Sequence, residues 1–196
     1  MTDNIILTDL SFRYREQFIF KNFNAKICRG ATTLVFGPSG SGKTTLLRLL
    51  LFLNAPSGGN ITGISNGETA AVFQEDRLAL HLSATMNIAL VLPKSFPKDE
   101  ILRQLRAVGI DETDSPKAVS EFSGGMRRRV ALVRAVISNR PVILMDEPFK
   151  ELDETTKQLV ADYIKKETNK KTLIIVSHDE TDAALFSADI LRINQA

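Results

Sequence analysis

A glycine-rich segment between two apolar runs constrains the fold of this chain more than any other feature. The segment reads Gly37-Pro38-Ser39-Gly40-Ser41-Gly42-Lys43-Thr44. Because apolar runs at 34–36 and 46–50 flank it, the sequence predicts a strand, a loop and then a helix. The glycines let successive backbone N–H groups turn inward, and the start of the helix adds a partial positive charge. The loop is therefore suited to bind phosphate.

Two side chains at the end of this loop have an expected task. Lys43 can reach the outer phosphates of a nucleotide, and the hydroxyl of Thr44 can bind Mg²⁺. The alternative is an ordinary glycine-rich turn, which the flanking strand and helix disfavour. The sequence therefore predicts a nucleotide site.

Composition predicts one domain with a sizeable core and excludes several other classes of protein. The 196 residues are 43% hydrophobic, and 25 basic residues nearly balance 23 acidic ones, so we expect no nucleic-acid partner. Cys28 is the only cysteine; this excludes an internal disulfide, and we expect it to be a small buried residue. The N-terminus has no signal-peptide pattern, and the apolar run at 46–53 is too short to cross a bilayer. Any membrane association is expected through another chain.

The order of predicted elements favours an α/β fold with a parallel sheet. Residues 5–12 and 18–27 alternate like strands, the Pro- and Gly-containing segment 56–60 is expected to end the first helix, and 83–119 has helical character. The expected later elements are a strand at 69–74, a helix ending at 138, a strand at 142–145, a helix at 154–167 and a strand at 172–176. Strands that alternate with helices in this way form parallel sheets.

A second chemical element is the apolar strand at 142–145, which ends in Asp146 and Glu147. In parallel sheets, ligands gather beyond the carboxyl ends of the strands. Asp146 is expected to hold Mg²⁺, and Glu147 stands where it can polarise an attacking water. The alternative, a solvated acidic pair, is less consistent with the phosphate loop earlier in the chain.

Three more features complete a pattern: Gln74 at the end of a strand, the segment 122–126 at the start of a helix, and His178 after a strand. With them, the chain resembles, from end to end, the nucleotide-binding subunit of an ATP-binding cassette (ABC) transporter. The resemblance implies the P-loop NTPase fold of ABC ATPases, with a mostly parallel sheet core, an N-terminal antiparallel β region and a helical subdomain. It implies one domain over 1–196, with 1–74 and 120–196 as the RecA-like core with the β region and 75–119 as the helical subdomain.

The resemblance implies ATP and Mg²⁺ as ligands and assigns roles to single residues. The expected catalytic residues are Lys43, Gln74, Glu147 (general base) and His178 (γ-phosphate and attacking water). The expected metal ligands are Thr44, Gln74 and Asp146. The expected nucleotide-binding residues are Tyr14, Gly37, Pro38, Ser39, Gly40, Ser41, Gly42, Lys43, Thr44, Thr45, Ser123, Gly124, Gly125 and Asp153. Tyr14 would stack on adenine, with Phe12 and Phe18 as rivals, whereas His81 matches no catalytic motif and is expected at the surface.

The segment 122–126, which we call the signature segment, has the residues of a second anion-binding helix start. Ser123 suits a helix cap, and the glycines after it expose backbone N–H groups. The resemblance implies that this segment meets the γ-phosphate held by a second subunit, in a head-to-tail homodimer or a pair with a similar subunit. Arg127, Arg128 and Arg129 are expected on a solvated helix face, with an approach to the facing subunit as the alternative.

The sequence departs from the family pattern at two places. Phe122 and Met126 replace the usual Leu and Gln around the Ser-Gly-Gly core, and Phe149-Lys150-Glu151-Leu152 stands before Asp153, where small residues are usual. We expect the chemistry to survive the first departure. The second departure alters the expected contact between subunits, and we expect it to slow ATP hydrolysis or change its rate.

Within the family, residues 72–78 and 124–130 are similar to importers of the nitrate, sulfonate and taurine type. This implies transmembrane permease partners, an extracytoplasmic solute-binding protein, and a cytoplasmic location on the inner face of the membrane through those partners. The alternatives are a separate-chain exporter ATPase and a soluble ABC ATPase without a transport role. A P-loop kinase or GTPase would not explain the signature segment or His178.

Overall fold

The computed structural model describes residues 4–194 and divides the chain into two units, each assembled from separate segments. The first unit comprises Met1–Ala71, Arg140–Glu147 and Lys170–Ala196, and the second comprises Val72–Asn139 and Pro148–Asn169. The second unit extends beyond the expected helical segment 75–119, because two later helices pack against the helices of that segment.

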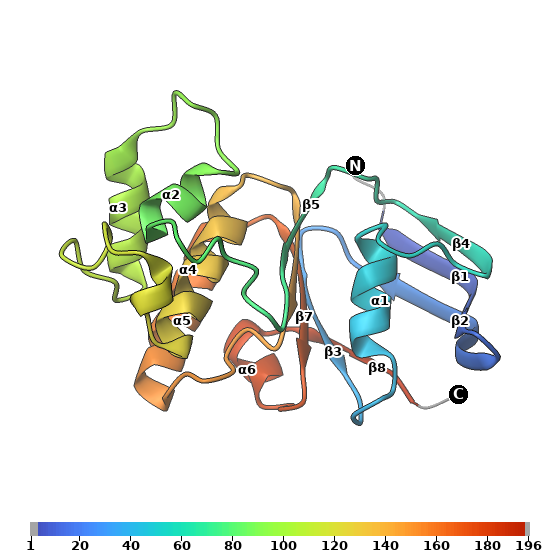
Figure 1. The fold of residues 1–196 in the computed structure, drawn as a ribbon. Helices are drawn as coiled ribbons and strands as arrows, with labels where there is room; N and C mark the ends of the chain where they lie inside the picture. The colour runs from blue at the N-terminus through green and yellow to red at the C-terminus, as the bar shows by residue number, and fades with distance from the viewer. Residues whose placement is uncertain (1–3, 195–196) are drawn as a thin grey trace. The chain divides into compact units, whose positions relative to one another are not determined.

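Figure 1 shows the strands and helices along the chain. The strands are β1 (Ile5–Tyr14), β2 (Gln17–Ile27), β3 (Thr32–Phe36), β4 (Gly58–Thr62), β5 (Thr69–Val72), β6 (Val142–Asp146), β7 (Thr172–Ser177) and β8 (Asp189–Arg192). The helices are α1 (Lys43–Leu50), α2 (Ala84–Ala89), α3 (Lys98–Ala107), α4 (Gly124–Ile137), α5 (Glu154–Glu167) and α6 (Asp182–Phe186), with a 3-10 turn η1 (Val119–Glu121).

The central sheet has the strand order β5-β6-β7-β3-β8 within the described residues. β3 pairs in parallel with β7 and β8, and β6 pairs in parallel with β7, as the alternation of strands and helices predicts. Every residue of β6 and β7 is buried, which is typical of parallel strands covered on both faces. The carboxyl ends of β3, β6 and β7 therefore meet at one edge of this sheet.

The first unit also contains an antiparallel sheet, in which β1 pairs with both β2 and β4. The prediction that segment 56–60 ends the first helix is wrong: α1 already ends at Leu50, and Gly58–Thr62 is a strand. Gly59 has φ +76°, and a Cβ there would lie 2.3 Å from the carbonyl oxygen of Asp9. The glycine that looks like a helix breaker thus allows β4 to approach β1 closely.

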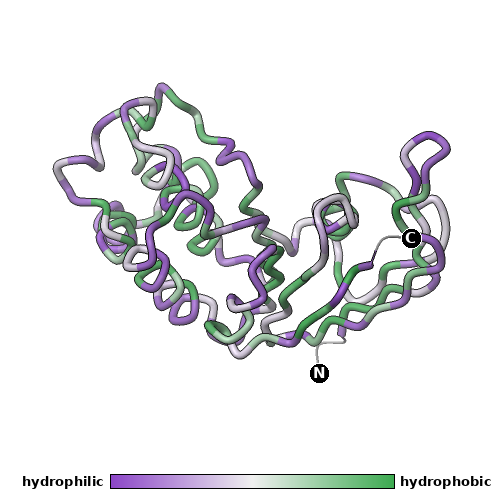
Figure 2. Tube along the Cα trace, turned by 90° about the horizontal axis from the view of Figure 1, so that it is seen from below, coloured by the Kyte–Doolittle hydropathy of each residue, from purple (hydrophilic) through white to green (hydrophobic). Residues whose placement is uncertain are grey.

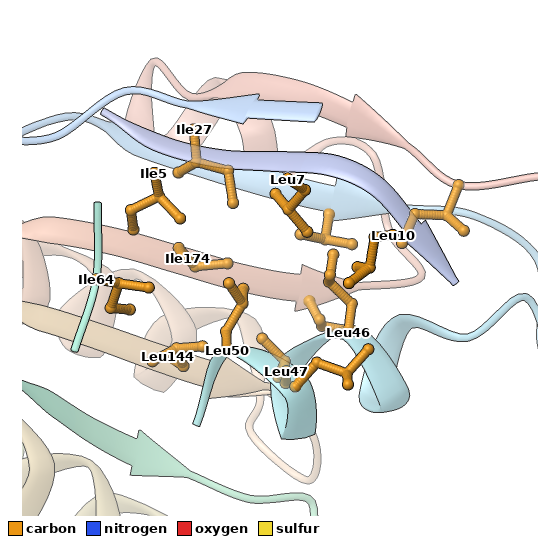
Figure 3. Close-up of a cluster of buried hydrophobic side chains, with 14 of the residues drawn as sticks. Ile5, Leu7, Leu10, Ile27, Leu46, Leu47, Leu50, Ile64, Leu144 and Ile174 are labelled. Atoms are coloured by element: carbon orange, nitrogen blue, oxygen red, sulfur yellow. The ribbon is translucent and has the colours of Figure 1, made fainter. Parts of the chain in front are cut away.

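The core of the first unit joins both sheets to α1. Figure 3 shows the buried side chains of β1 facing those of α1, β6 and β7. The labelled core residues are Ile5, Leu7, Leu10, Ile27, Leu46, Leu47, Leu50, Ile64, Leu144 and Ile174. In Figure 2, where hydrophobic residues are green, long green stretches follow the strands of this unit. This packing fixes α1, and with it the phosphate loop at its N-terminus.

The second unit is built from helices that follow the sequence signals closely. α3 has Pro97 as its N-cap residue, buries Ile101 and Leu105, and ends before Gly109, whose φ is +74°. α4 packs against α2, α3 and α5. α5 has the predicted bounds.

Two elements near the end of the chain are absent from the sequence prediction. α6 and β8 span only five and four residues, too few to give a clear periodic pattern, yet β8 pairs in parallel with β3. Cys28, expected to be buried, is partly exposed. Among residues 4–194, none of the helices combines the length and apolar character needed to span a bilayer.

Candidate nucleotide-binding site

The glycines of the phosphate loop are required by close backbone and side-chain approaches. A Cβ at Gly37 would lie 2.3 Å from the carbonyl oxygen of Ile193, and a Cβ at Gly42 would lie 2.6 Å from Cγ2 of Ile19. Gly40 and Gly42 have φ values of +79° and +98°, which L-residues rarely adopt. The loop conformation thus depends on glycine at these positions.

The N-terminus of α1 is open to an anion. Its N-cap residue is Gly42, which offers no side-chain acceptor to the first-turn amides. The ammonium group of Lys43 donates to the carbonyl oxygens of Gly37 (2.7 Å) and Pro38 (2.9 Å), so the lysine is curled over the loop. A cation and unpaired backbone donors at a helix start are the elements of a phosphate site.

Two of the expected metal ligands lie together. The Thr44 hydroxyl donates to Oδ2 of Asp146 at 2.9 Å, and Asp146, at the end of β6, is only 3% exposed. A hydroxyl and a carboxylate suit Mg²⁺, which takes few protein ligands and completes its shell with phosphates and water. Residues 4–194 hold no cluster of three or more His, Cys, Asp or Glu suited to a metal. Gln74, the third expected ligand, is exposed just after β5 and belongs to the second unit.

Glu147 and His178, both expected to be catalytic, are in contact. His178 Nδ1 lies 2.8 Å from Glu147 Oε2. Because an ionised carboxylate only accepts hydrogen bonds, the imidazole must donate through Nδ1. The backbone amide of Glu147 donates to the carbonyl of Val176 at 2.9 Å, and its φ is +50°, unusual for a non-glycine residue. Such backbone strain concentrates at functional sites.

Tyr14 is the best-placed aromatic near the phosphate loop. Its side chain is 44% exposed, its ring meets Phe12 edge-on with centroids 4.9 Å apart, and its hydroxyl accepts from Asn54 at 3.2 Å. Partial burial opposes ionisation, but hydrogen bonds from Thr45 and Asn54 contribute to a lowered pKa of the Tyr14 phenol. Of the two other aromatic residues considered for stacking on adenine, Phe12 is buried and therefore unsuited to it, whereas Phe18 is 43% exposed.

The signature segment lies in the second unit and begins α4. Ser123 is the N-cap residue, is exposed, and accepts a hydrogen bond from the amide of Met126 at 3.2 Å. A Cβ at Gly124 would lie 2.0 Å from Oε2 of Glu151, and one at Gly125 would lie 3.1 Å from the Glu151 carbonyl oxygen. The two glycines therefore make room for Glu151, one of the residues at which this chain departs from the family pattern.

Asp153 has a structural partner of its own. It is the N-cap residue of α5 and accepts from the amide of Thr156 at 2.9 Å and from its hydroxyl at 2.8 Å. Those hydrogen bonds lower the pKa of Asp153. The side chain is exposed, so the cap does not remove it from the surface.

The expectation that Arg127, Arg128 and Arg129 form a solvated helix face is wrong. All three donate to backbone carbonyl oxygens: Arg127 to Phe122 (2.6 Å), Arg128 to Phe73 and Pro148 (3.3 Å to the latter), and Arg129 to Val108 and Gly109 (2.8 Å each). Arg128 is only 3% exposed and also pairs with Asp76 at 3.3 Å. The acceptors of Arg128 and Arg129 lie 20 or more residues away in sequence, so no local sequence signal reveals them. His81 is exposed, as expected.

Comparisons with known proteins identify the family to which the chain is similar. Residues 20–150 match the model of a family described as ABC transporter. The chain is 34% identical over 209 residues to the ergothioneine transport ATP-binding protein EgtV of Helicobacter pylori, covering 98% of both proteins. It is 33% identical over 194 residues to the thiamine import ATP-binding protein ThiQ of Escherichia coli, covering 91% of this chain and 82% of ThiQ.

Solved structures show the same fold. The chain superposes with a TM-score of 0.83 and 26% identity on the dimeric ATP-binding cassette MJ0796 bound to ADP and Pi, covering 97% of this chain and 94% of that one. A bacterial Atm1-family ABC exporter with ATP bound gives a TM-score of 0.87 at 23% identity, over 98% of this chain and 37% of that chain. The predicted α/β fold, with its parallel sheet, antiparallel β region and helices, is thereby confirmed.

Proposed function

Because the chain belongs to the ABC transporter family and is an ATPase subunit of it, we propose that it hydrolyses ATP to drive solute uptake through separate membrane subunits. The observation that carries this proposal is the cluster at the carboxyl ends of β6 and β7. There the Thr44–Asp146 and Glu147–His178 contacts lie beyond the parallel strands. This is the position in which open parallel sheets bind ligands.

The phosphate loop would hold the ATP triphosphate. The backbone of 39–45 offers amides to the phosphate oxygens, and Lys43 exchanges its two carbonyl contacts for contacts to the outer phosphates. Tyr14 offers an exposed ring face to the adenine base. Mg²⁺ would be held by Thr44 and Asp146, with Gln74 as a further oxygen donor, and it would neutralise charge on the phosphate oxygens.

Glu147 is proposed as the general base. Its carboxylate has one oxygen bonded to the His178 ring, which orients it, and its side chain is 18% exposed, enough for a water molecule to approach. His178 is 78% exposed and so can also contact an incoming γ-phosphate. The attacking water would pass its proton to Glu147 as its oxygen bonds to phosphorus and the bond to the ADP oxygen breaks.

The active unit is proposed to be a head-to-tail dimer, of this chain or with a similar subunit. In it, Ser123, Gly124 and Gly125 of each subunit would bind the γ-phosphate held by the other, with Asp153 near that contact. Support comes from Ser123, the exposed N-cap residue of α4, and from MJ0796, which is itself a dimer.

The complete system is proposed to include transmembrane permease subunits and an extracytoplasmic solute-binding protein, which would hold this chain on the cytoplasmic face of the membrane. The relatives carry names of ergothioneine, thiamine and spermidine/putrescine transport. Those names support uptake of small organic nitrogen compounds and give no support to the narrower nitrate, sulfonate and taurine type.

Glu147→Gln tests the proposal. We expect this variant to bind ATP normally, to lose most turnover, about 100-fold or more, and to accumulate an ATP-dependent dimer, because the base is removed while the binding groups remain. Size-exclusion chromatography with light scattering measures the dimer, and Glu180→Gln, an exposed carboxylate of the same unit, is the control. If Glu147→Gln stays monomeric at saturating MgATP, even with the permease supplied, the composite site is refuted.

A further inference from the structure

The start of α4 already has an anionic group of its own chain against it. The Glu151 carboxylate covers Gly124: a Cβ there would lie 2.0 Å from Oε2 and 3.2 Å from Cδ of Glu151. The Glu151 carbonyl oxygen approaches the next residue, Gly125, in the same way. Both contacts lie within the second unit. The position of this side chain is thus defined by the signature segment itself.

The chemistry of this contact is that of an anion at a helix start. The N-terminus of α4 has a partial positive charge, which favours a nearby carboxylate. Glu151 itself is exposed. Its backbone has φ +66°, a conformation that glycine adopts more readily.

We propose that Glu151 is an autoinhibitory residue. Its carboxylate lies against Gly124, in space that the terminal phosphate of the partner subunit's ATP must enter, so the dimer closes only after Glu151 moves away. This inference rests on the composite site of the proposed function. Two effects act together: the side chain fills the space, and its negative charge repels the phosphate.

The inference predicts a change in the ATP requirement for closure. In the Glu147→Gln background, which traps the dimer, adding Glu151→Gln should lower the MgATP concentration for half-maximal dimer formation on the order of tenfold, because the repulsion is removed. Glu151→Gly, which also removes the bulk and suits the positive φ, should lower it further. Analytical ultracentrifugation across a MgATP titration measures both variants.

The matched control is Glu154→Gln in the same background. Glu154 has the same charge, lies three residues away in the first turn of α5, and is exposed. Its substitution should leave the titration unchanged. A fluorescent ATP analogue should bind all the monomers with equal affinity, because Glu151 is proposed to act on the partner's nucleotide.

The outcomes separate the two proposals. If Glu147→Gln dimerises and Glu151→Gln changes nothing, or changes no more than Glu154→Gln, the autoinhibitory role is refuted and the composite site stands. If Glu151→Gln alters nucleotide affinity of the monomer, the role is also refuted. If Glu147→Gln dimerises, and the Glu151 variants dimerise at lower MgATP concentrations while Glu154→Gln does not, the autoinhibitory role is supported. If none of the variants dimerises, both proposals fall.

Discussion

The N-termini of α1 and α4 look alike in sequence, since both begin in glycine-rich segments, yet the structure prepares them differently. α1 begins at Gly42 without a side-chain cap and has the Lys43 ammonium group curled beside it. α4 begins with the Ser123 hydroxyl on its amides and the Glu151 carboxylate against Gly124. The start of α1 has no carboxylate of its own chain at its cap, whereas we propose that at the start of α4 the Glu151 carboxylate must move away before a phosphate can bind.

The surroundings of the two helix starts extend the contrast. The α1 end has Asp146, Glu147 and His178 of its own unit, all with groups that could act on a phosphate ester. In α4, the buried Arg128 donates to the backbone carbonyls of Phe73 and Pro148 and pairs with Asp76. We propose that the α1 end binds ATP and takes part in its hydrolysis, and that the α4 end recognises the ATP held by the partner subunit.

The largest expected effect tests how the α4 end is held. Arg128→Met should lower the free energy of unfolding by about 2–4 kcal/mol, because the Phe73 and Pro148 carbonyls lose a buried donor and Asp76 loses its partner. Urea denaturation measures this loss.

The control is Arg103→Met, which removes a surface ion pair with Glu100 on α3 and should cost less than about 1 kcal/mol. Equal losses in the two variants would mean that Arg128 is no more than a surface arginine in energetic terms. The proposed difference between the start of α1, which lies near acidic residues and a histidine, and the start of α4, which Arg128 holds in place, would then be wrong.

Arg128 also marks the limit of what the sequence predicts. The phosphate loop and α3 were predictable because their signals are local: glycine spacing in one case, a periodic apolar face and a Pro97 start in the other. Asp146 and Glu147 follow from the rule that parallel sheets bind ligands at the carboxyl ends of their strands, whereas the role of His178 is implied by the resemblance to the family. Arg128 depends on carbonyls 55 and 20 residues away, which become its neighbours only on folding.

Close approaches between backbone segments set a second limit. The sequence did not predict β4, because Gly59 suggests the end of a helix. Its role in the close approach of β4 to β1 is visible only in the folded structure. The contact between Glu151 and Gly124 was hidden in the same way, although the departure from small residues before Asp153 marked the segment as unusual. Composition and periodicity report on single elements, whereas these features belong to pairs of elements.

The next effect in size tests the α1 end. Lys43→Ala should weaken ATP binding by about 10- to 150-fold, the equivalent of about 1.5–3 kcal/mol for hydrogen bonds to a charged group. Isothermal titration calorimetry measures the affinity. Lys26→Ala, which removes an exposed cation of β2 in the same unit, should leave it unchanged. If Lys43→Ala binds ATP with unaltered affinity, Lys43 does not bind the phosphates, and the proposed difference between the two helix starts is wrong.

The smallest effect separates recognition from stability at the α4 end. Ser123→Ala should cost about 1 kcal/mol of stability, the usual loss for a serine cap, and Ser83→Ala should cost a similar amount, because Ser83 caps α2 with the same 3.2 Å bond to an amide three residues on. Only Ser123→Ala should raise the MgATP concentration needed to dimerise the Glu147→Gln variant, since its hydroxyl alone is proposed to meet a phosphate. Thermal melts and light scattering measure the two properties. If the serines affect dimer formation equally, Ser123 is only a helix cap, and phosphate recognition at α4 must rest on the backbone amides of Gly124 and Gly125, beside which Glu151 lies.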